Sequence, residues 1–375
     1  MHDDPGSAAG DRPQQPDGAR DLWFLLFGVV LLAVGIWSES GISGQDEYWL
    51  SFRTVLEMQE RGEWLTPYVD GAVRLQKPPL LSWLMLVNFE LCGPSFFAAR
   101  IWCALAGAGL AFATLKIHRL FGGRGYLAGL LVLAAAGVAV DSRRAMFDLP
   151  VGCLVTIAIW TTLRWGRSGR LSWLLGSAVA LAAAALTKGP VALLFFAVPF
   201  VAALPVFRRP SRALPWRHLL PALALFLALA LPWPLWVAWR WPEFWNVMNE
   251  QADSREFGFA GIGRLGGLIG ACLGLVVPWS AMLLGSVLGL VRGRGERRAE
   301  RWWWLGWCVL GALPFAFMKT FERYMLALVC PMALLVAAWL PTLAPRHQRA
   351  HLTVAAALLT LPAVLFAAFD LWFGL

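Results

Sequence analysis

Long apolar runs, each close to about twenty residues, recur along nearly the whole chain and restrict its fold more than any other feature. A helix of that length crosses the hydrocarbon core of a bilayer and satisfies its own backbone hydrogen bonds there. Only 15% of the residues are charged and 59% are hydrophobic, which leaves too few polar side chains to cover a soluble globule. The sequence therefore predicts an all-α polytopic membrane protein.

The apolar runs predict about eleven transmembrane helices with short polar loops between them. The predicted spans are residues 21–38, 96–118, 126–140, 149–163, 171–187, 190–206, 217–238, 265–290, 302–318, 323–341 and 350–372. A further apolar segment, 80–92, is too short to cross and is expected to lie as a partly buried helix on the membrane surface. The polar, proline-rich residues 1–20 are expected to form a disordered cytoplasmic tail. No soluble domain is expected after the last span.

The charged residues predict the orientation of the chain. With a cytoplasmic N-terminus, most of the basic residues fall in inner loops and most of the acidic residues fall outside, as the positive-inside rule requires. Counting segment 80–92 as a span would place the basic loop LKIHRLFGGRG outside and reverse most later loops. The net charge of +9 therefore reflects membrane orientation, and no nucleic-acid partner is expected.

The positions of the histidines and cysteines argue against a metal site or a histidine base on the outer face. All five histidines fall on the inner side, which disfavours a histidine base or a histidine-bound metal on the outer face. The six cysteines lie in or beside apolar runs without a CxxC pair, so neither disulfides nor a thiolate metal site is expected.

The first outer loop, residues 40–95, concentrates ionisable residues between two spans, and a second long outer loop covers 239–264. An interfacial helix is predicted for residues 46–60, ended by Gly62. A small hairpin is predicted about Asp70-Gly71. Pro78-Pro79 can start the helix over 80–92 and fix the direction in which Lys77 projects.

These motifs resemble a known family. Asp46-Glu47 before a helix, Gln76-Lys77-Pro78-Pro79, and Arg143 with Asp148 after the third span are similar to the outer loops of GT-C glycosyltransferases of the ArnT and protein O-mannosyltransferase group. Gln76 stands where many members of the ArnT subgroup have glutamate. The similarity continues through Lys188-Gly189-Pro190, Lys319 and Arg323-Tyr324.

The resemblance implies a GT-C fold for residues 21–375 and a multi-pass protein of the bacterial inner membrane with a periplasmic active site. It also implies transfer of a sugar from a polyprenyl-phosphate donor, such as an undecaprenyl carrier, to a lipid, glycan or protein acceptor. The expected stereochemistry is a single inversion at the anomeric carbon.

Such a donor already contains a good leaving group, so the reaction needs cations for the phosphate and a carboxylate for the acceptor proton. Asp46 is the predicted base, Glu47 a neighbour that orients the acceptor or sugar, and Asp148 a second carboxylate across the cleft. The candidate phosphate ligands are Lys77, Arg143, Lys188, Lys319 and Arg323, and the candidate substrate contacts are Tyr48, Gln76 and Tyr324. A carboxylate could also hold Mg²⁺ or Mn²⁺ against the phosphate, although no loop has a recognisable ligand spacing.

Each candidate also has a structural interpretation. Asp46 and Asp148 can cap the helices that follow them, and Lys188 can extend to the membrane surface from a helix end. Lys319 and Arg323 can form an interfacial ion pair with Glu322. The tryptophans between residues 233 and 245 are expected to form an interfacial belt rather than a sugar platform, and the loop 243–259 could form a lid.

A transporter or flippase of an amphipathic lipid is the alternative function. Transporters bind substrate near the middle of the membrane, often between repeated halves. This chain has no evident internal repeat, and its ionisable residues lie at helix ends on one side, which favours the enzyme.

Overall fold

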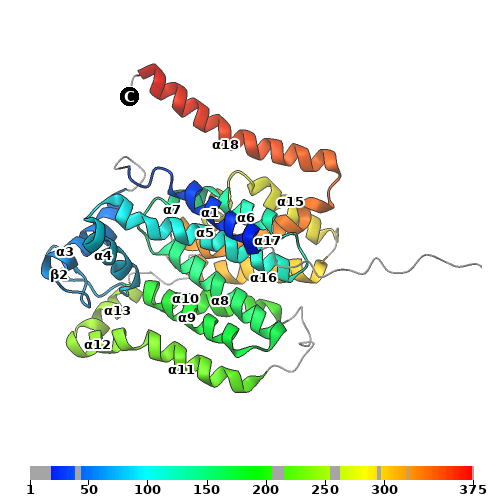
Figure 1. Ribbon diagram of the computed structural model, residues 1–375. Coiled ribbons are helices and arrows are strands. Elements are labelled where there is room, and N and C mark those ends of the chain that lie inside the picture. Colours follow the sequence, from blue (N-terminus) through cyan, green and yellow to red (C-terminus); the bar gives the residue numbers. More distant parts are fainter. Residues whose placement is uncertain are drawn as a thin grey trace, which may run out of the picture.

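The computed structural model describes residues 18–38, 44–204, 215–253, 262–293, 297–318 and 321–373, and nearly all regular structure among them is helical (Figure 1). Most helices run along one long axis and form the body of the molecule. The helices of this body are α1 (Gly18–Ala33), α5 (Phe96–Leu120), α6 (Tyr126–Leu133), α7 (Ala136–Asp141), α8 (Asp148–Ser168), α9 (Leu171–Lys188), α10 (Val191–Ala203), α11 (Leu219–Ala230), α12 (Pro232–Arg240), α14 (Ile262–Leu275), α15 (Ser280–Val291), α16 (Arg298–Ala312) and α17 (Val329–Trp339). The last helix, α18 (Pro345–Phe373), projects along one side.

Every predicted span coincides with helical structure. Within the described residues, five helices are long and apolar enough to cross a membrane, or six if the bent pair α14 and α15 forms one span. The number of about eleven spans stays a prediction. The segment predicted as one span over 265–290 is not one continuous helix, because α14 and α15 meet at 115°. Pro278 lies in the break, where it cannot donate the backbone hydrogen bond that would continue a helix.

The core is densest around α17, whose side chains are almost all buried. Large aromatic side chains pack near it, among them Trp279, Trp303, Trp304 and Trp307. Two glycines of α15 make room for Trp339: a Cβ atom at Gly285 or Gly289 would lie 2.7 or 2.9 Å from its ring. These close contacts fix α15 against α17 and thereby hold the segment that leads into α17.

One end of the body carries the first outer loop. Its helical run consists of α2 (Gly44–Glu47), a π-helical turn (Tyr48–Phe52) and α3 (Arg53–Arg61). In this wide turn the Arg53 amide donates a hydrogen bond to the Tyr48 carbonyl, five residues earlier rather than the usual four. Gly62 ends the run with a φ of 65°, as predicted.

The predicted hairpin is confirmed. Strands β1 (Tyr68–Val69) and β2 (Ala72–Val73) pair antiparallel, and Asp70 and Gly71 form the turn with positive φ angles of 50° and 77°. The carboxylate of Glu57 is buried against this turn. Its oxygens accept from the Asp70 and Gly71 amides at 2.6 and 3.0 Å. The hairpin is therefore fastened to α3.

The short helix predicted over 80–92 is α4 (Leu80–Cys92), which follows Pro79 directly. Leu81, Met85 and Phe89 are buried on one of its sides and pack against the other elements of this end. The start of α4 fixes the preceding Lys77-Pro78-Pro79 segment, as the two prolines predict.

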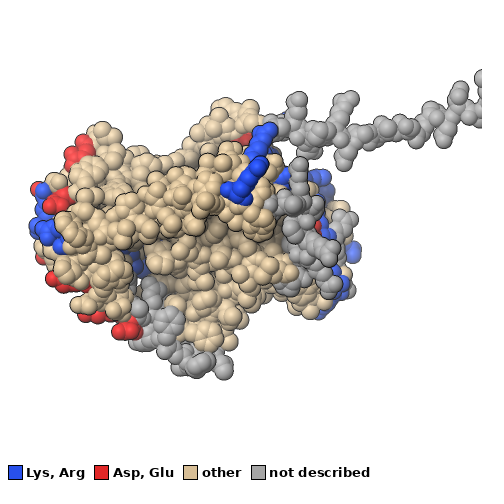
Figure 2. All heavy atoms as spheres, turned by 90° about the horizontal axis from the view of Figure 1, so that it is seen from below, with Lys and Arg blue, Asp and Glu red and all other residues tan. Residues whose placement is uncertain are grey.

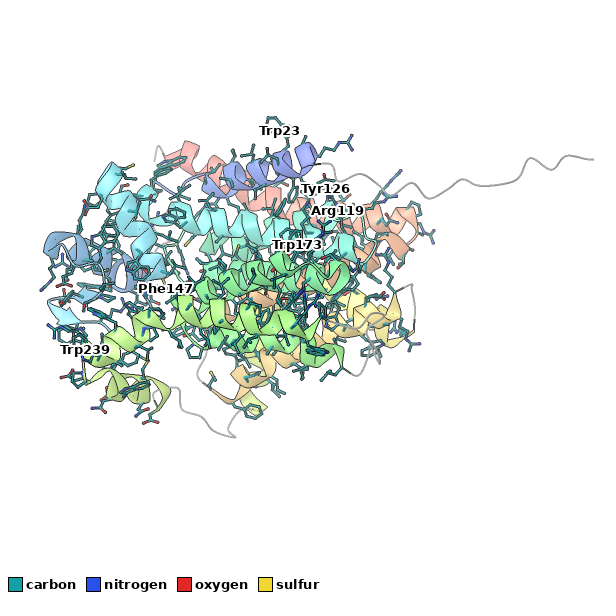
Figure 3. The ribbon with its side chains drawn as sticks, turned by 60° about the horizontal axis from the view of Figure 1, so that its bottom comes forward. Trp23, Arg119, Tyr126, Phe147, Trp173 and Trp239 are labelled. Atoms are coloured by element: carbon teal, nitrogen blue, oxygen red, sulfur yellow. The ribbon has the colours of Figure 1, made fainter. Side chains whose placement is uncertain are left out.

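The other end of the body carries a separate ion cluster. Asp21 of α1 accepts hydrogen bonds from Lys116, Arg119 and Tyr126. Figure 3 shows Arg119 and Tyr126 close together, away from the end that contains Phe147 and Trp239. On the face seen in Figure 2, charged side chains gather at the two ends, with a broad uncharged surface between them. This distribution suits a protein whose middle lies in lipid.

Candidate functional site

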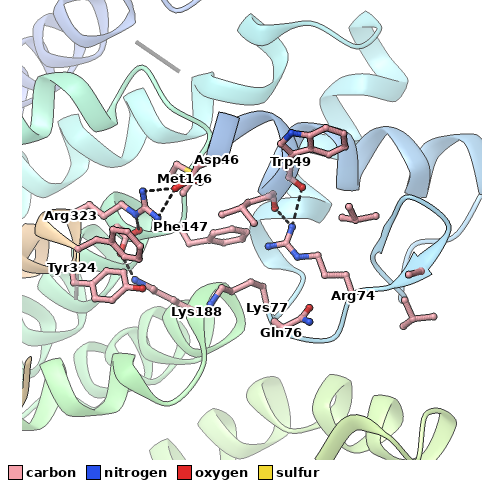
Figure 4. A pocket seen from close by; sticks show the side chains of 16 residues that line it. Asp46, Trp49, Arg74, Gln76, Lys77, Met146, Phe147, Lys188, Arg323 and Tyr324 are labelled. Carbon is pink, nitrogen blue, oxygen red and sulfur yellow. Dashed lines mark hydrogen bonds and ion pairs between the residues drawn. The ribbon is translucent and has the colours of Figure 1, made fainter. Parts of the chain in front are cut away.

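A cavity of about 550 Å³ opens at the end that carries the first outer loop. Four stretches far apart in the sequence form its walls: the start of the α2 to α3 run, the hairpin and the segment after it, the turn before α8 with the end of α9, and the segment before α17 (Figure 4). Its lining residues are Asp46, Trp49, Leu50, Val69, Ala72, Val73, Arg74, Gln76, Lys77, Met146, Phe147, Asp148, Lys188, Phe321, Arg323 and Tyr324.

Arg323 links two carboxylates of the cavity. It lies in the 3₁₀-helical segment Glu322–Leu328, directly before α17. Both terminal nitrogens lie 3.1 Å from Asp46 Oδ2, and Nε lies 3.5 Å from Asp148 Oδ2. The Asp46 side chain is 56% exposed and that of Asp148 only 5% exposed. One guanidinium thus connects an open carboxylate with a buried one.

Lys188 forms the second cationic contact of Asp148. It is the last residue of α9, which ends at Gly189 with a φ of 83°. Lys188 Nζ bonds to Asp148 Oδ1 and lies 3.9 Å from the centre of the Tyr324 ring. The carboxylate of Asp148 therefore holds Lys188 and Arg323 on one side of the cavity.

The opposite wall contributes Arg74, Gln76 and Lys77, which enter the cavity from the hairpin and the segment after it (Figure 4). Arg74 donates to Thr54 Oγ1 at 2.9 Å and to the Leu50 carbonyl. Burial lowers the pKa of Arg74 to about 10, so its guanidinium remains protonated at neutral pH. The described lining thus contains four cations and two carboxylates.

Comparison with known proteins shows which proteins this chain resembles. Residues 76–236 match the family model of dolichyl-phosphate-mannose-protein mannosyltransferase. The undecaprenyl phosphate-alpha-4-amino-4-deoxy-L-arabinose arabinosyl transferase of Serratia proteamaculans is 28% identical over 295 residues, which cover 76% of this chain and 52% of the relative. The chain thus spans about half the length of the curated relatives that it matches.

Solved structures have the same fold. ArnT from Cupriavidus metallidurans in the apo state superimposes with a TM-score of 0.74 at 22% identity, over 90% of this chain and 62% of that one. The same ArnT bound to undecaprenyl phosphate gives a TM-score of 0.73, at 22% identity, over 90% and 63%. The chain is therefore similar in sequence to protein mannosyltransferases and to ArnT, and it has the ArnT fold. It is a multi-pass membrane protein with the GT-C fold predicted from its sequence motifs.

The cavity of this GT-C chain unites seven of the eleven predicted site residues. These are Asp46, Gln76, Lys77, Asp148, Lys188, Arg323 and Tyr324. Asp46 lies inside the helical run rather than before it. Asp148 accepts a hydrogen bond from Lys188 and forms an ion pair with Arg323, and the residue before it provides no side-chain cap for α8. Arg323 pairs with Asp46 and Asp148, whereas the ion pair considered from the sequence involved Glu322.

Glu47 lies away from the cavity. Its side chain is fully buried, and its two oxygens accept from Arg100 Nε and Nη2 at 2.7 and 2.8 Å. The amide of Ala145 adds a third bond at 2.7 Å, and Arg100 Nη1 also donates to the Ser38 carbonyl at 2.7 Å. Glu47 therefore joins α2 to α5 and to the turn before α8, and its position does not support direct contact with substrate.

Three other candidates are not part of the described cavity. Arg143 donates to the Val34 and Ala139 carbonyls at 2.9 and 2.6 Å, so its guanidinium binds the backbone beside α1. Tyr48 packs against Trp49 and Phe52 outside the lining. Lys319 lies outside the described residues.

Sequence reasoning missed several lining residues, of which Arg74, Trp49 and Phe321 matter most. No motif singles out Arg74 among the arginines, and its role depends on the fold of the hairpin. The tryptophans that were expected to form an interfacial belt differ in exposure. Trp239 and Trp245 are 79% and 61% exposed, whereas Trp233 is buried and donates to the Leu65 carbonyl at 2.9 Å. Of the predicted lid, α13 (Phe244–Asp253) is described, and the rest lies outside the described residues.

Asp141 was also missed. It is the last residue of α7, is 4% exposed, and has an Oδ1 atom without a hydrogen-bond partner. Burial, followed by the nearby charge of Asp148, raises the pKa of Asp141 to about 7, while Arg144 and Arg323 act in the opposite direction. Asp141 thus lies behind the Asp148 side of the cavity as a carboxyl that is easily protonated.

The described residues contain no group of three or more His, Cys, Asp or Glu side chains that could hold a metal ion. The two lining carboxylates are bonded to protein cations instead. A Mg²⁺ or Mn²⁺ ion at these two carboxylates would have to compete with Lys188 and Arg323.

Proposed function

We propose that this chain moves a sugar from a polyprenyl-phosphate carrier to a hydroxyl group of a lipid, glycan or protein acceptor. The observation that carries the proposal is the single cavity shared by Asp46, Lys77, Lys188 and Arg323. Undecaprenyl phosphate is the proposed carrier, because the curated relatives are named for it and a solved ArnT structure contains it.

Lys77, Lys188 and Arg323 are the proposed phosphate ligands, with Arg74 adding positive charge behind them. The phosphodiester of the donor carries one negative charge, and a second develops as the bond between the anomeric carbon and the phosphate oxygen breaks. Four lining cations and two carboxylates leave a positive excess that matches the released phosphate. Cations fixed in advance stabilise this developing charge and so lower the barrier.

Asp46 is the proposed general base. Its side chain is the exposed partner of Arg323, so an acceptor hydroxyl can reach it. The acceptor oxygen attacks the anomeric carbon, the polyprenyl phosphate leaves with the bonding electrons, and the hydroxyl proton passes to Asp46 and then to water. A single displacement of this kind inverts the anomeric centre. A positioned base contributes about 10²- to 10⁴-fold in rate.

Asp148 and Glu47, first considered as direct participants, are proposed to position other residues. Asp148 is buried, accepts a hydrogen bond from Lys188 and forms an ion pair with Arg323, so it keeps both cations directed into the cavity. Glu47 holds α2 through Arg100 and thereby sets the position of Asp46. Gln76 and Tyr324 remain proposed substrate contacts because they line the cavity.

The proposed location is the bacterial inner membrane, with the N-terminus in the cytoplasm and the cavity on the periplasmic side. The positive-inside distribution of charge supports this orientation. The C-terminal ends of α8 and α15, which carry Arg167 and Arg292, lie at the end opposite the cavity.

Binding of undecaprenyl phosphate to the purified, full-length protein tests the phosphate site. We expect saturable binding that Lys188→Ala weakens roughly tenfold, because a hydrogen bond to a charged group is worth about 1.5–3 kcal/mol. Arg124→Ala, at the opposite end, is the matched control and should bind as the wild type does. Absence of saturable binding would contradict the proposed carrier.

Turnover tests the base and separates the enzyme from a flippase. Undecaprenyl-phosphate-linked sugars are incubated with the protein and with membranes of the source cells as acceptor, and released undecaprenyl phosphate is measured. Asp46→Asn should keep the affinity for undecaprenyl phosphate and lose about a hundredfold or more in release. Undiminished release by Asp46→Asn would refute the assigned base. Movement of intact donor across vesicles without cleavage would favour the flippase.

A further inference from the structure

The charges around the cavity restrict the sugar as well as the phosphate. We infer that the donor sugar of this chain carries no cationic group, unlike the 4-amino-4-deoxy-L-arabinose for which the curated relatives are named. The inference rests on the proposed function, because it concerns the sugar that the same cavity takes.

Both lining carboxylates are already bonded to cations of the protein. Asp46 Oδ2 accepts from two nitrogens of Arg323 at 3.1 Å, and Asp148 bonds to Lys188 and lies 3.5 Å from Arg323 Nε. An ammonium group on the sugar would have to compete with these guanidinium and lysine contacts. If it paired with Asp46, it would also occupy the proposed base.

Aromatic rings are the other partners that bind cations, and two rings of the lining are already in use. Lys188 Nζ lies 3.9 Å from the centre of the Tyr324 ring, and the Arg323 guanidinium carbon lies 4.6 Å from that of Phe321. A cation gains from such a ring only when it lies over the face. The cavity thus places its own positive charges over the rings nearest the proposed phosphate site.

Two buried acidic residues of this end form their contacts outside the cavity. Glu47 is bonded to Arg100, and Glu57 is bonded to the hairpin turn and to Arg53. The position beside Lys77 in the lining is Gln76, an uncharged amide. Among the described residues, no further carboxylate lines the cavity.

An amine on the sugar is protonated at neutral pH, so it would enter a cavity whose four cations exceed its two carboxylates by two positive charges. Like charges close together in a partly desolvated site repel each other. A hydroxyl at the same sugar position avoids this repulsion and can accept from Gln76 or a lysine. We expect the neutral sugar to bind more tightly by roughly fivefold, which corresponds to about 1 kcal/mol.

The experiment compares two donors that differ only at one position: undecaprenyl phosphate-linked 4-amino-4-deoxy-L-arabinose and undecaprenyl phosphate-linked L-arabinose. Each competes with labelled undecaprenyl phosphate for the full-length protein, so no acceptor is needed. Tighter binding of the L-arabinose donor supports the inference. Equal or tighter binding of the amino sugar overturns it while leaving the proposed function intact.

A charge variant gives an independent readout. Gln76→Glu adds a carboxylate with little change in volume, and we expect it to shift the ratio of the two affinities toward the amino sugar by roughly fivefold. Gln59→Glu makes the same change on α3, outside the cavity, and should leave the ratio unchanged. An unchanged ratio in Gln76→Glu would contradict the part of the inference that assigns specificity to this wall. If labelled undecaprenyl phosphate itself fails to bind, the proposed function and the inference both fall.

Discussion

Both terminal nitrogens of Arg323 lie 3.1 Å from Asp46 Oδ2, although 277 residues separate the two in sequence. The same guanidinium reaches Asp148 through Nε at 3.5 Å. Because a guanidinium is planar and rigid, it sets the distance between an exposed and a buried carboxylate. A lysine ammonium provides charge without this geometry.

Substitutions of Arg323 should therefore distinguish the effect of its positive charge from the effect of its guanidinium geometry. We expect Arg323→Ala to weaken undecaprenyl phosphate binding roughly tenfold and Arg323→Lys to weaken it much less. Both variants should lose at least about tenfold in turnover, because Asp46 is no longer held. Competition binding and release of undecaprenyl phosphate measure the two effects. Full turnover by Arg323→Lys would show that the bridge is unnecessary.

The Glu47 and Arg100 pair should behave as a structural unit. Breaking a buried ion pair on one side costs about 3–5 kcal/mol, so Glu47→Gln should lower the Tm strongly. Glu60→Gln, on the exposed surface of α3, is the control and should change stability by less than about 0.5 kcal/mol. In a double-mutant cycle, Glu47→Gln with Arg100→Gln should lose less than the sum of the single variants. A stable Glu47→Gln protein without turnover would instead indicate a direct role.

Asp141 should make stability depend on pH. In the folded protein the pKa of Asp141 is raised from 3.8 to about 7. As the pH rises, the Asp141 carboxyl loses its proton in the unfolded chain before it does so in the folded protein, so the free energy of unfolding falls between about pH 4 and pH 7. Asp141→Asn removes this effect. The difference in Tm between Asp141→Asn and wild type, followed by tryptophan fluorescence, should be more positive at pH 8 than at pH 5. Asp70→Asn, an exposed carboxylate, is the control, and an equal difference at both pH values would contradict the expectation.

Glu57 should govern the hairpin wall of the cavity. Burial alone would raise its pKa, but the Gly71 and Asp70 amides and the charge of Arg53 lower it. Ionised Glu57 therefore stabilises the folded protein at pH values above the pKa that Glu57 has in the unfolded chain. This contribution is lost as the pH falls through the pKa of Glu57 in the folded protein. Glu57→Gln should destabilise the hairpin by about 1–2 kcal/mol and speed hydrogen exchange at Asp70 and Gly71. Glu63→Gln is the control and should leave hydrogen exchange at Asp70 and Gly71 unchanged. Unchanged exchange in Glu57→Gln would show that the hairpin does not need the Glu57 carboxylate.

The orientation can be measured by cysteine labelling in intact cells, in a Cys92→Ser background. Glu60→Cys lies on α3 at the cavity end, and Ser172→Cys lies at the start of α9 at the opposite end. A thiol reagent that cannot cross the inner membrane should label Glu60→Cys at once and Ser172→Cys only after the membrane is permeabilised. The reverse pattern would invert the proposed topology.

Local features of the fold were predictable because neighbouring residues determine them. Gly62 ends a helix, Asp70-Gly71 forms a tight turn, and Pro78-Pro79 precede α4, each for reasons of backbone geometry. The bend between α14 and α15 was not predictable, because hydropathy reports the length of an apolar segment and not the direction of its helix axis. Pro278 was the one signal there, and a proline inside an apolar run is compatible with a continuous, kinked span.

The candidate site shows the same limit. The motifs identified seven residues of the cavity, but motif position alone did not distinguish Asp46, which faces the cavity, from Glu47, which faces the core. Arg143 was chosen for its charge next to a predicted span, yet its guanidinium binds the backbone just after α1 and within α7. Which of two adjacent charged residues faces the cavity depends on helix rotation, and long-range packing sets that rotation.

The π-helical turn at Tyr48–Phe52 controls this rotation. Successive residues of an α-helix are about 100° apart, and a π-helical turn accommodates one extra residue, so the same residues in a regular α-helix would rotate everything before the turn by about that angle relative to α3. Glu47 would then take the direction of Asp46 toward the cavity, and Tyr48 would take the direction of Glu47 toward Arg100. The extra residue of the wide turn therefore decides which side chain of the Asp46-Glu47-Tyr48 sequence faces the cavity.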